Sequence, residues 1–127
     1  MDIKKLILGM VLEAYDNSSE EIKEYITREY LEDLDGYYIN DFLKEFKNKS
    51  IENKDYIISI EDRNFDGNNG SDIYVVYKIT NKQDIFSKLY IQYGKYNSWD
   101  YDIWYDDFYE VQKVSKVIYD YERVTNN

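Results

Sequence analysis

The sequence predicts an α+β fold, in which about three N-terminal helices pack on a C-terminal antiparallel β-meander of four to five strands. Apolar residues recur at helical spacing over residues 1–50, and they alternate with polar residues over much of 51–127. Helices followed by strands with short connections are typical of helices packed on one face of an antiparallel sheet. The 127 residues contain no proline and no linker-like segment, so we expect a single domain, 1–127.

Three helices are expected in the first part of the chain. The first covers about 2–15, where apolar side chains occupy most sides of the helix, so we expect it to be largely buried. Ser18 and Glu21 have the spacing of a capping box, which predicts that a second helix begins there and is ended by Gly36. A short third helix is expected over about 37–47.

The strands are predicted from the alternation of apolar and polar residues. We expect strands near 55–62 and 72–80, and a third over 85–93 after a turn. Residues 96–110 are expected to be part strand and part loop, and a last strand is expected near 111–123. Short connections between these strands favour a meander, in which each strand pairs with the next.

The residue types that are missing exclude several function classes. The chain has no Cys and no His, which excludes disulfides, thiol nucleophiles, His-based triads and His-based zinc sites. Because the usual general base near neutral pH is missing, we expect a protein that is not an enzyme and has no cofactor. The loop from Asp62 begins like a calcium loop, but Ile73 stands where a bidentate Glu is required, so no metal site is expected.

The charge is strongly acidic, with 26 Asp and Glu residues against 16 Lys and Arg residues and a formal net charge of −10. We therefore expect no direct binding to nucleic acid or to an anionic membrane, and the natural complement is a basic protein. The apolar run 3–12 is too short to span a membrane and lacks a signal-peptide cleavage site, so it reads as a core helix. An acidic surface that only confers solubility is the simplest alternative.

Residues 96–110 form the most informative segment, with seven aromatic residues, five carboxylates and no Lys or Arg. A buried strand does not carry so many unpaired charges, and an ordinary loop does not carry so many rings. We interpret the segment as a surface for a basic partner, in which the rings supply contact area. The candidate partner-binding residues are Trp99, Asp100, Tyr101, Asp102, Trp104, Tyr105, Asp106, Asp107 and Glu110.

The spacing of the carboxylates in this segment suggests mimicry of nucleic acid. In an extended strand, Asp100 and Asp102 would lie on one face about 6.6 Å apart, close to the spacing of successive phosphates. Alternatively, the rings line an open sheet face and the Asp residues solvate a long hairpin. Asp106 and Asp107 could also form a catalytic acid and base, but neighbours on a strand point to opposite faces, which argues against that pair.

The order of elements and a few local patterns resemble small phage and mobile-element proteins, among them anti-CRISPR proteins. These patterns are Tyr-Gly-Lys-Tyr-Asn-Ser-Trp at 93–99, an acidic turn, and a closing strand that ends Tyr-Asp-Tyr-Glu at 119–122. The resemblance implies an inhibitor, a monomer or homodimer in the cytoplasm of a bacterial host cell, that binds a CRISPR effector or another host nuclease. Its carboxylates would pair with the Arg and Lys residues that otherwise hold nucleic acid.

Three other functions share these sequence features. An immunity protein or antitoxin that blocks a basic toxin nuclease would carry the same acidic, aromatic surface. A self-assembling structural or interaction domain would use the rings to contact further copies of the chain. A small-molecule binder would hold its ligand in an apolar pocket, which helices followed by a curved sheet can form.

Overall fold

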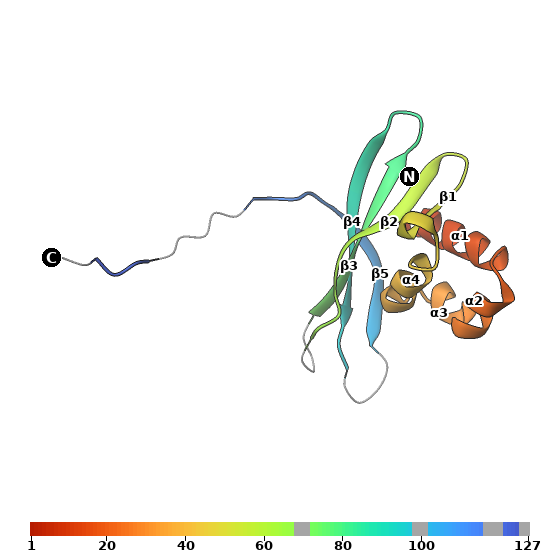
Figure 1. The fold of residues 1–127 in the computed structure, drawn as a ribbon, viewed down its shortest axis with the longest axis horizontal. Helices are drawn as coiled ribbons and strands as arrows, with labels where there is room; N and C mark the ends of the chain where they lie inside the picture. Colours follow the sequence, from red (N-terminus) through yellow and green to blue (C-terminus); the bar gives the residue numbers. More distant parts are fainter. Residues whose placement is uncertain (68–71, 98–101, 116–120, 125–127) are drawn as a thin grey trace.

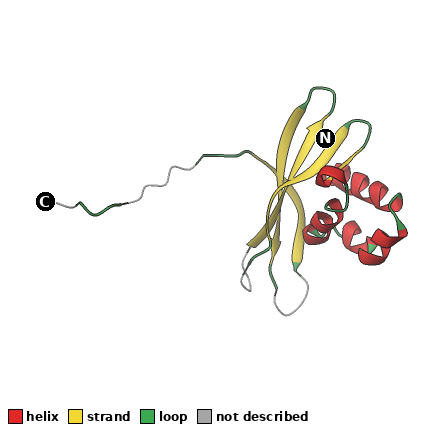
Figure 2. Ribbon diagram, in the orientation of Figure 1, coloured by secondary structure: helices red, strands yellow, loops and turns green. Residues whose placement is uncertain are grey.

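The computed structural model describes residues 1–67, 72–97, 102–115 and 121–124. The helices gather on one side of a five-stranded sheet (Figures 1 and 2), which confirms the predicted α+β fold with N-terminal helices and a C-terminal meander. None of the described helices is long and apolar enough to cross a membrane. The helices within the described residues are α1 (Ile3–Asp16), α2 (Glu20–Tyr25), α3 (Arg28–Glu32), α4 (Gly36–Leu43) and the 3₁₀ turn η1 (Lys47–Lys49).

The sheet is an antiparallel meander with the order β1-β2-β3-β4-β5, so that β3 is central and β1 and β5 are the edges. The predicted strands 55–62, 72–80 and 85–93 correspond to β2, β3 and β4. Alternation could not reveal β1, because it has only three residues. The strands are β1 (Ser50–Glu52), β2 (Tyr56–Asn64), β3 (Asp72–Asn81), β4 (Phe86–Lys95) and β5 (Ile103–Val111).

The hydrophobic core lies between the helices and one face of the sheet, which we call the inner face. Val75, Tyr77 and Ile79 of β3 belong to this core, as alternate residues of a strand must if they share a face. Ile7 of α1 and Phe42 of α4 are fully buried against them. Because α1 contacts both β1 and β5, it crosses the inner face from one edge strand to the other. The opposite, outer face carries no helix among the described residues (Figure 2).

The predicted second helix is divided into α2 and α3. Between them the backbone is extended at Ile26, whose side chain is buried. The Tyr15 hydroxyl donates a hydrogen bond to the Ile26 carbonyl at 2.7 Å, which holds the break in place. The predicted N-cap was wrong by one residue. The hydroxyl oxygen of Ser19, and not that of Ser18, accepts a hydrogen bond from the Ile22 amide at 3.3 Å.

Gly36 begins α4 and does not end the preceding helix, which corrects the prediction. The chain reverses at Leu34, whose φ of 55° lies in the left-handed region that residues other than glycine rarely adopt. Asp35 is the N-cap of α4 and accepts a hydrogen bond from the Tyr38 amide at 3.1 Å. Glycine is needed at position 36 because a Cβ there would lie 2.7 Å from Cζ3 of Trp104.

The predicted last strand, 111–123, is wrong for the residues that the structure describes. β5 ends at Val111, and residues 112–115 and 121–124 have no strand structure, while 116–120 lie outside the described residues. The side of β4 away from β3 is paired with residues 103–111, so these residues, and not 111–123, form the strand next to β4. The acidic aromatic segment thus contributes the edge strand itself.

Candidate functional site

β5 divides the acidic aromatic segment between the two faces of the sheet. The residues that face the helices are Trp104, Asp106, Phe108 and Glu110. The residues on the outer face are Ile103, Tyr105, Asp107, Tyr109 and Val111. This division follows from the period of two along a strand, and it separates Asp106 from Asp107 as expected. The other candidates, Trp99, Asp100 and Tyr101, lie outside the described residues.

The two inward carboxylates have cationic partners from other elements. Lys4 of α1 lies 2.5 Å from Asp106, and Lys88 of β4 lies 3.3 Å from Glu110. The hydrogen bond from Lys4 lowers the pKa of the Asp106 carboxyl below its ordinary value. The segment contains no cation of its own, but the fold supplies these two lysines. Asp106 and Glu110 are therefore less available to a partner than the sequence indicates.

Asp102 stands just before β5 and is engaged locally. Its Oδ1 accepts a hydrogen bond from the Asn97 amide at 3.0 Å, which joins the end of β4 to the start of β5. Asp100, the other member of the proposed phosphate-like pair, lies outside the described residues. Asp102 is thus a loop carboxylate that stabilises the connection between β4 and β5.

Trp104 is half-buried and packs against the hydrophobic core. A Cβ at Gly36 would lie 2.7 Å from one ring carbon of Trp104, and a Cβ at Gly94 would lie 2.8 Å from another. The ring of Phe65 meets the indole edge-on, with centroids 6.0 Å apart. Trp104 therefore fills the space between α4 and the sheet, and we leave it out of the candidate contact surface.

The outer face carries a shallow pocket that joins three strands. It has a volume of about 430 Å³ and contains two rings, Tyr93 and Tyr109, whose centroids are 6.4 Å apart. Its three tyrosines are 40%, 45% and 55% exposed in chain order. We call it the tyrosine–carboxylate pocket, and it is lined by Asp72, Tyr93, Tyr105, Asp107 and Tyr109.

The pocket has the chemistry of a cation site. Among the described residues, neither Asp72 nor Asp107 takes part in an ion pair. Lys95 is opposite Asp72 in the pairing of β3 with β4 and is the cation nearest to the pocket by register. Carboxylates attract a guanidinium or ammonium group, and the faces of tyrosine rings add cation–π attraction.

A bulge in β5 produces this arrangement. Gln92 pairs with Phe108, and two residues further along β4 Gly94 pairs with Trp104, so three residues of β5 lie opposite the single residue Tyr93. A bulge of this kind bends the strand and redirects its side chains. Tyr105 and Asp107 belong to the bulged residues and reach the pocket.

Gln92 holds the bulge from within the core. It is fully buried, and its Nε2 donates hydrogen bonds to the Tyr105 carbonyl at 2.8 Å and to the Leu34 carbonyl at 2.7 Å. Its Oε1 accepts a hydrogen bond from the Tyr77 hydroxyl at 2.7 Å. Burial raises the pKa of Tyr77 far above its ordinary value, so the hydroxyl stays protonated and remains a donor.

The sequence reasoning missed Asp72, Tyr93 and Gln92. Asp72 is far from residues 102–111 in the chain, whereas Tyr93 lies on the preceding strand, and both reach the pocket through the pairing of β3, β4 and β5. One signal was available for Asp72: it precedes Ile73, which begins the inward alternation of its strand, so it must point outward. Gln92 gave no signal, because a polar residue in an alternating strand is ordinarily on the solvent face.

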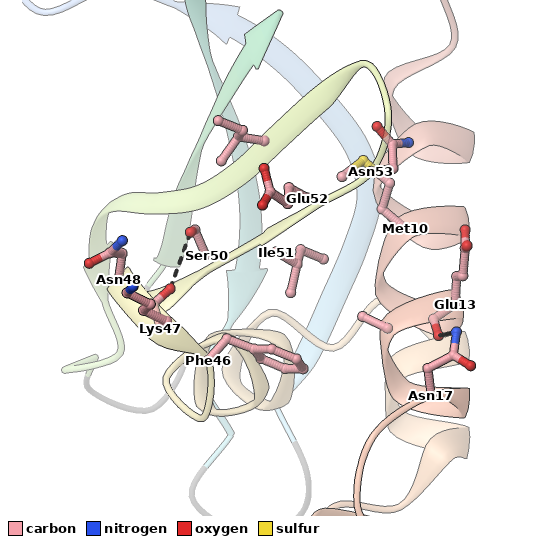
Figure 3. A pocket seen from close by; sticks show the side chains of 12 residues that line it. Met10, Glu13, Asn17, Phe46, Lys47, Asn48, Ser50, Ile51, Glu52 and Asn53 are labelled. Atoms are coloured by element: carbon pink, nitrogen blue, oxygen red, sulfur yellow. Dashed lines mark hydrogen bonds between the residues drawn. The ribbon is translucent and has the colours of Figure 1, made fainter. Parts of the chain in front are cut away.

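A second hollow lies between α1 and β1 (Figure 3) and has a volume of about 520 Å³. Met10, Phe46 and Ile51 supply apolar surface to it. Its polar lining includes both Glu13 and Lys47, so it selects no single charge of ligand. Within the described residues, none of the candidate partner-binding residues lines it.

Asp35, the N-cap of α4, gives a pH-dependent prediction. Burial raises the pKa of its carboxyl to about 6, and Asp102 and Asp33 add to the rise. This pKa lies above the value of about 3.9 in the unfolded chain, so the folded protein favours the protonated Asp35 carboxyl. The contribution of the protonated carboxyl to the free energy of unfolding is therefore complete below about pH 4 and is lost as the pH rises through 6. We expect Asp35→Asn to raise the free energy of unfolding by about 2 kcal/mol at pH 8 and by about half of that at pH 5.

Urea unfolding at the two pH values measures this effect. Asparagine is as good an N-cap as aspartate, so the helix start is kept. The matched comparison is Asp33→Asn, an exposed position two residues earlier that is the smallest cause of the rise, so we expect it to change stability much less than Asp35→Asn at either pH. A gain from Asp35→Asn that is the same at pH 5 and pH 8 would contradict the raised pKa.

No protein-family model, curated protein or solved structure matches the chain. The fold and the site define the class by themselves: an acidic α+β protein with a tyrosine-lined, carboxylate-bearing pocket on the outer face of its sheet.

Proposed function

We propose that this protein is an acidic inhibitor of the anti-CRISPR type. It binds a basic host protein that handles nucleic acid, such as a CRISPR effector or another nuclease, and competes with the DNA or RNA. The observation that supports the proposal is the tyrosine–carboxylate pocket on a chain whose net charge is −10. Proteins that bind nucleic acid hold its phosphates with Arg and Lys side chains, which are the groups that such a pocket attracts.

The competition is both electrostatic and steric. An Arg side chain that enters the pocket would donate hydrogen bonds to Asp72 and Asp107, and its planar guanidinium would stack on the ring of Tyr93 or Tyr105. A side chain held in this way cannot hold a phosphate. The net charge would speed the encounter with a basic surface, and added salt would slow it.

The contact surface proposed from the sequence is thereby narrowed to its outward half. Tyr105 and Asp107 remain in it, and Asp72, Tyr93 and Tyr109 are added. Asp106 and Glu110 belong to the other face and already have lysine partners.

The double variant Asp72→Asn/Asp107→Asn tests the proposal. We expect it to weaken binding to the target by at least about tenfold at 100 mM salt, because two carboxylates that meet cations are lost while the shape is kept. The matched control is Asp106→Asn on the same strand, which we expect to leave the affinity within about twofold because that carboxylate faces Lys4. The affinities are measured by titration of purified CRISPR effectors and nucleases, with their DNA as competitor.

The outcomes of this titration separate the functions. Loss of affinity in the double variant, with competition by DNA, supports an inhibitor that displaces nucleic acid. Equal losses in the double variant and in Asp106→Asn would contradict the pocket as the contact. Tight binding to a toxin nuclease and to no effector would identify an immunity protein instead.

A further inference from the structure

β5 is a long, open edge of the sheet. It has nine residues and stands last in the strand order, and the described residues supply no strand beside it. The other edge, β1, has only three residues. An unpaired edge presents a row of backbone donors and acceptors, which is a template for a strand from another molecule.

The direction of the β5 amides follows from the register of the sheet. The Lys82 amide donates a hydrogen bond to the Asp55 carbonyl at 2.8 Å, which identifies these two residues as a hydrogen-bonded pair next to β2 and β3. Hydrogen-bonded and non-hydrogen-bonded pairs alternate along each pair of antiparallel strands. Counting from this pair through the registers of β2 with β3, β3 with β4 and β4 with β5 shows which β5 residues are hydrogen-bonded to β4. Val111 therefore directs its backbone groups to β4, whereas Phe108 and Glu110 direct theirs to the open edge.

We infer that this edge binds an extended segment of the partner protein as a sixth strand, and that the segment carries Lys or Arg at alternate positions. The inference rests on the proposed function for the basic character of the partner. The backbone of the segment would pair with Phe108 and Glu110. Its outward side chains would lie beside Tyr105, Asp107 and Tyr109, so that the strand delivers its cations to the tyrosine–carboxylate pocket.

Charge decides which strand fits the edge. β5 carries Asp106, Asp107 and Glu110 and has no Lys or Arg. A second copy of β5 is disfavoured, because an antiparallel pair centred on Asp107 places the two Asp107 carboxylates opposite each other. The two copies could also pair one position further along, centred on Phe108, so that the backbone groups at the open edge still pair. In that register Asp106 of one copy lies opposite Glu110 of the other. A basic strand replaces the repulsion at Asp107 with an attractive cross-strand pair.

A proline at position 110 tests the edge without breaking the sheet. Because the Glu110 amide points away from β4, Glu110→Pro removes no hydrogen bond to β4, but it removes a donor that an added strand needs. The matched control is Glu110→Gln, which removes the same charge and the same pair with Lys88 but keeps the amide. Unchanged amide spectra in the rest of the sheet establish that both variants are folded.

The probe is a ten-residue peptide of alternating Arg and Thr, titrated into the isotope-labelled full chain. In the wild-type protein, we expect the peptide to slow hydrogen exchange at the Phe108 and Glu110 amides at least about tenfold. We expect Glu110→Pro to bind the peptide at least about tenfold more weakly than Glu110→Gln does. A peptide of alternating Glu and Thr is expected not to bind.

The possible results distinguish failure of the strand site from failure of the proposed function. Equal affinities of the two variants, or peptide binding that leaves both amides unprotected, would show that side chains alone make the contact, and the proposed function would stand. Self-association that protects the same amides without peptide would replace the basic segment by a second copy. Edge binding of the peptide together with no binding to any basic nuclease would support the strand site and refute the proposed function.

Discussion

Gln92→Leu is expected to lower the free energy of unfolding by about 3 kcal/mol. The side-chain amide of Gln92 is fully buried and joins three parts of the fold, through the Tyr77 hydroxyl and the carbonyls of Leu34 and Tyr105. Leucine has a similar volume but leaves all three groups without this partner, and an unpaired buried polar group costs about 1–3 kcal/mol. Urea unfolding followed by circular dichroism measures the loss.

A second substitution in the same network identifies the cause. Tyr77→Phe is expected to cost about 1 kcal/mol in the wild-type protein, because it removes a buried hydrogen bond. In the Gln92→Leu background we expect it to restore about 1 kcal/mol, because it removes a hydroxyl that has lost its acceptor. The opposite signs are the signature of the network, and additive losses would contradict it.

The Gln92 network also connects stability to the site. Leu34 adopts a strained left-handed conformation, and its carbonyl is held by the same amide that holds the bulge at Tyr105. Gln92→Leu is therefore expected to weaken partner binding as well, although Gln92 itself is fully buried.

Gly36→Ala is expected to destabilise the wild-type protein by about 2 kcal/mol and to stabilise a Trp104→Leu protein by about 0.5 kcal/mol. The three atoms nearest to a Cβ at position 36 are all ring carbons of Trp104, at 2.7–3.0 Å. The overlap costs stability only while the ring is present. Once it is removed, the better helix propensity of alanine remains. The four proteins of this double-mutant cycle are compared by urea unfolding.

Gly9 of α1 provides the control for this cycle. A Cβ at Gly9 would meet no atom within 4 Å, so only helix propensity acts there. Gly9→Ala is expected to stabilise the protein by about 0.5–1 kcal/mol in both backgrounds. If Gly36→Ala had the same sign with and without Trp104, direct contact between the two positions would not be the reason for the glycine.

The fold class could be predicted because the side-chain period is a local property. The alternation of Val75, Tyr77 and Ile79 shows which side of β3 is buried, whatever the strand pairs with. The helix boundaries were predicted less well, because tertiary contacts decide them. Ile26 leaves the helix to be buried, and Leu34 takes a left-handed conformation that sequence patterns assign to glycine.

The part of the candidate site that could be predicted also depends on local properties of the sequence. Composition alone marks residues 96–110 as unusual, and the period of two separates Asp106 from Asp107. The bulge opposite Tyr93 could not be foreseen, because it depends on a hydrogen bond from Gln92 to a backbone carbonyl of the next strand.

The acidity, the α+β order of elements and the placement of Asp106 and Asp107 on opposite faces of a strand follow from the sequence alone. Which carboxylates pair with lysines depends on the three-dimensional fold. Lys4 meets Asp106 across 102 positions of the chain, and Asp72 reaches Asp107 through the pairing of three strands. Periodicity is a property of neighbouring residues, whereas charge pairing depends on distances in space, and those are set by strand register and by the packing of α1 on the sheet.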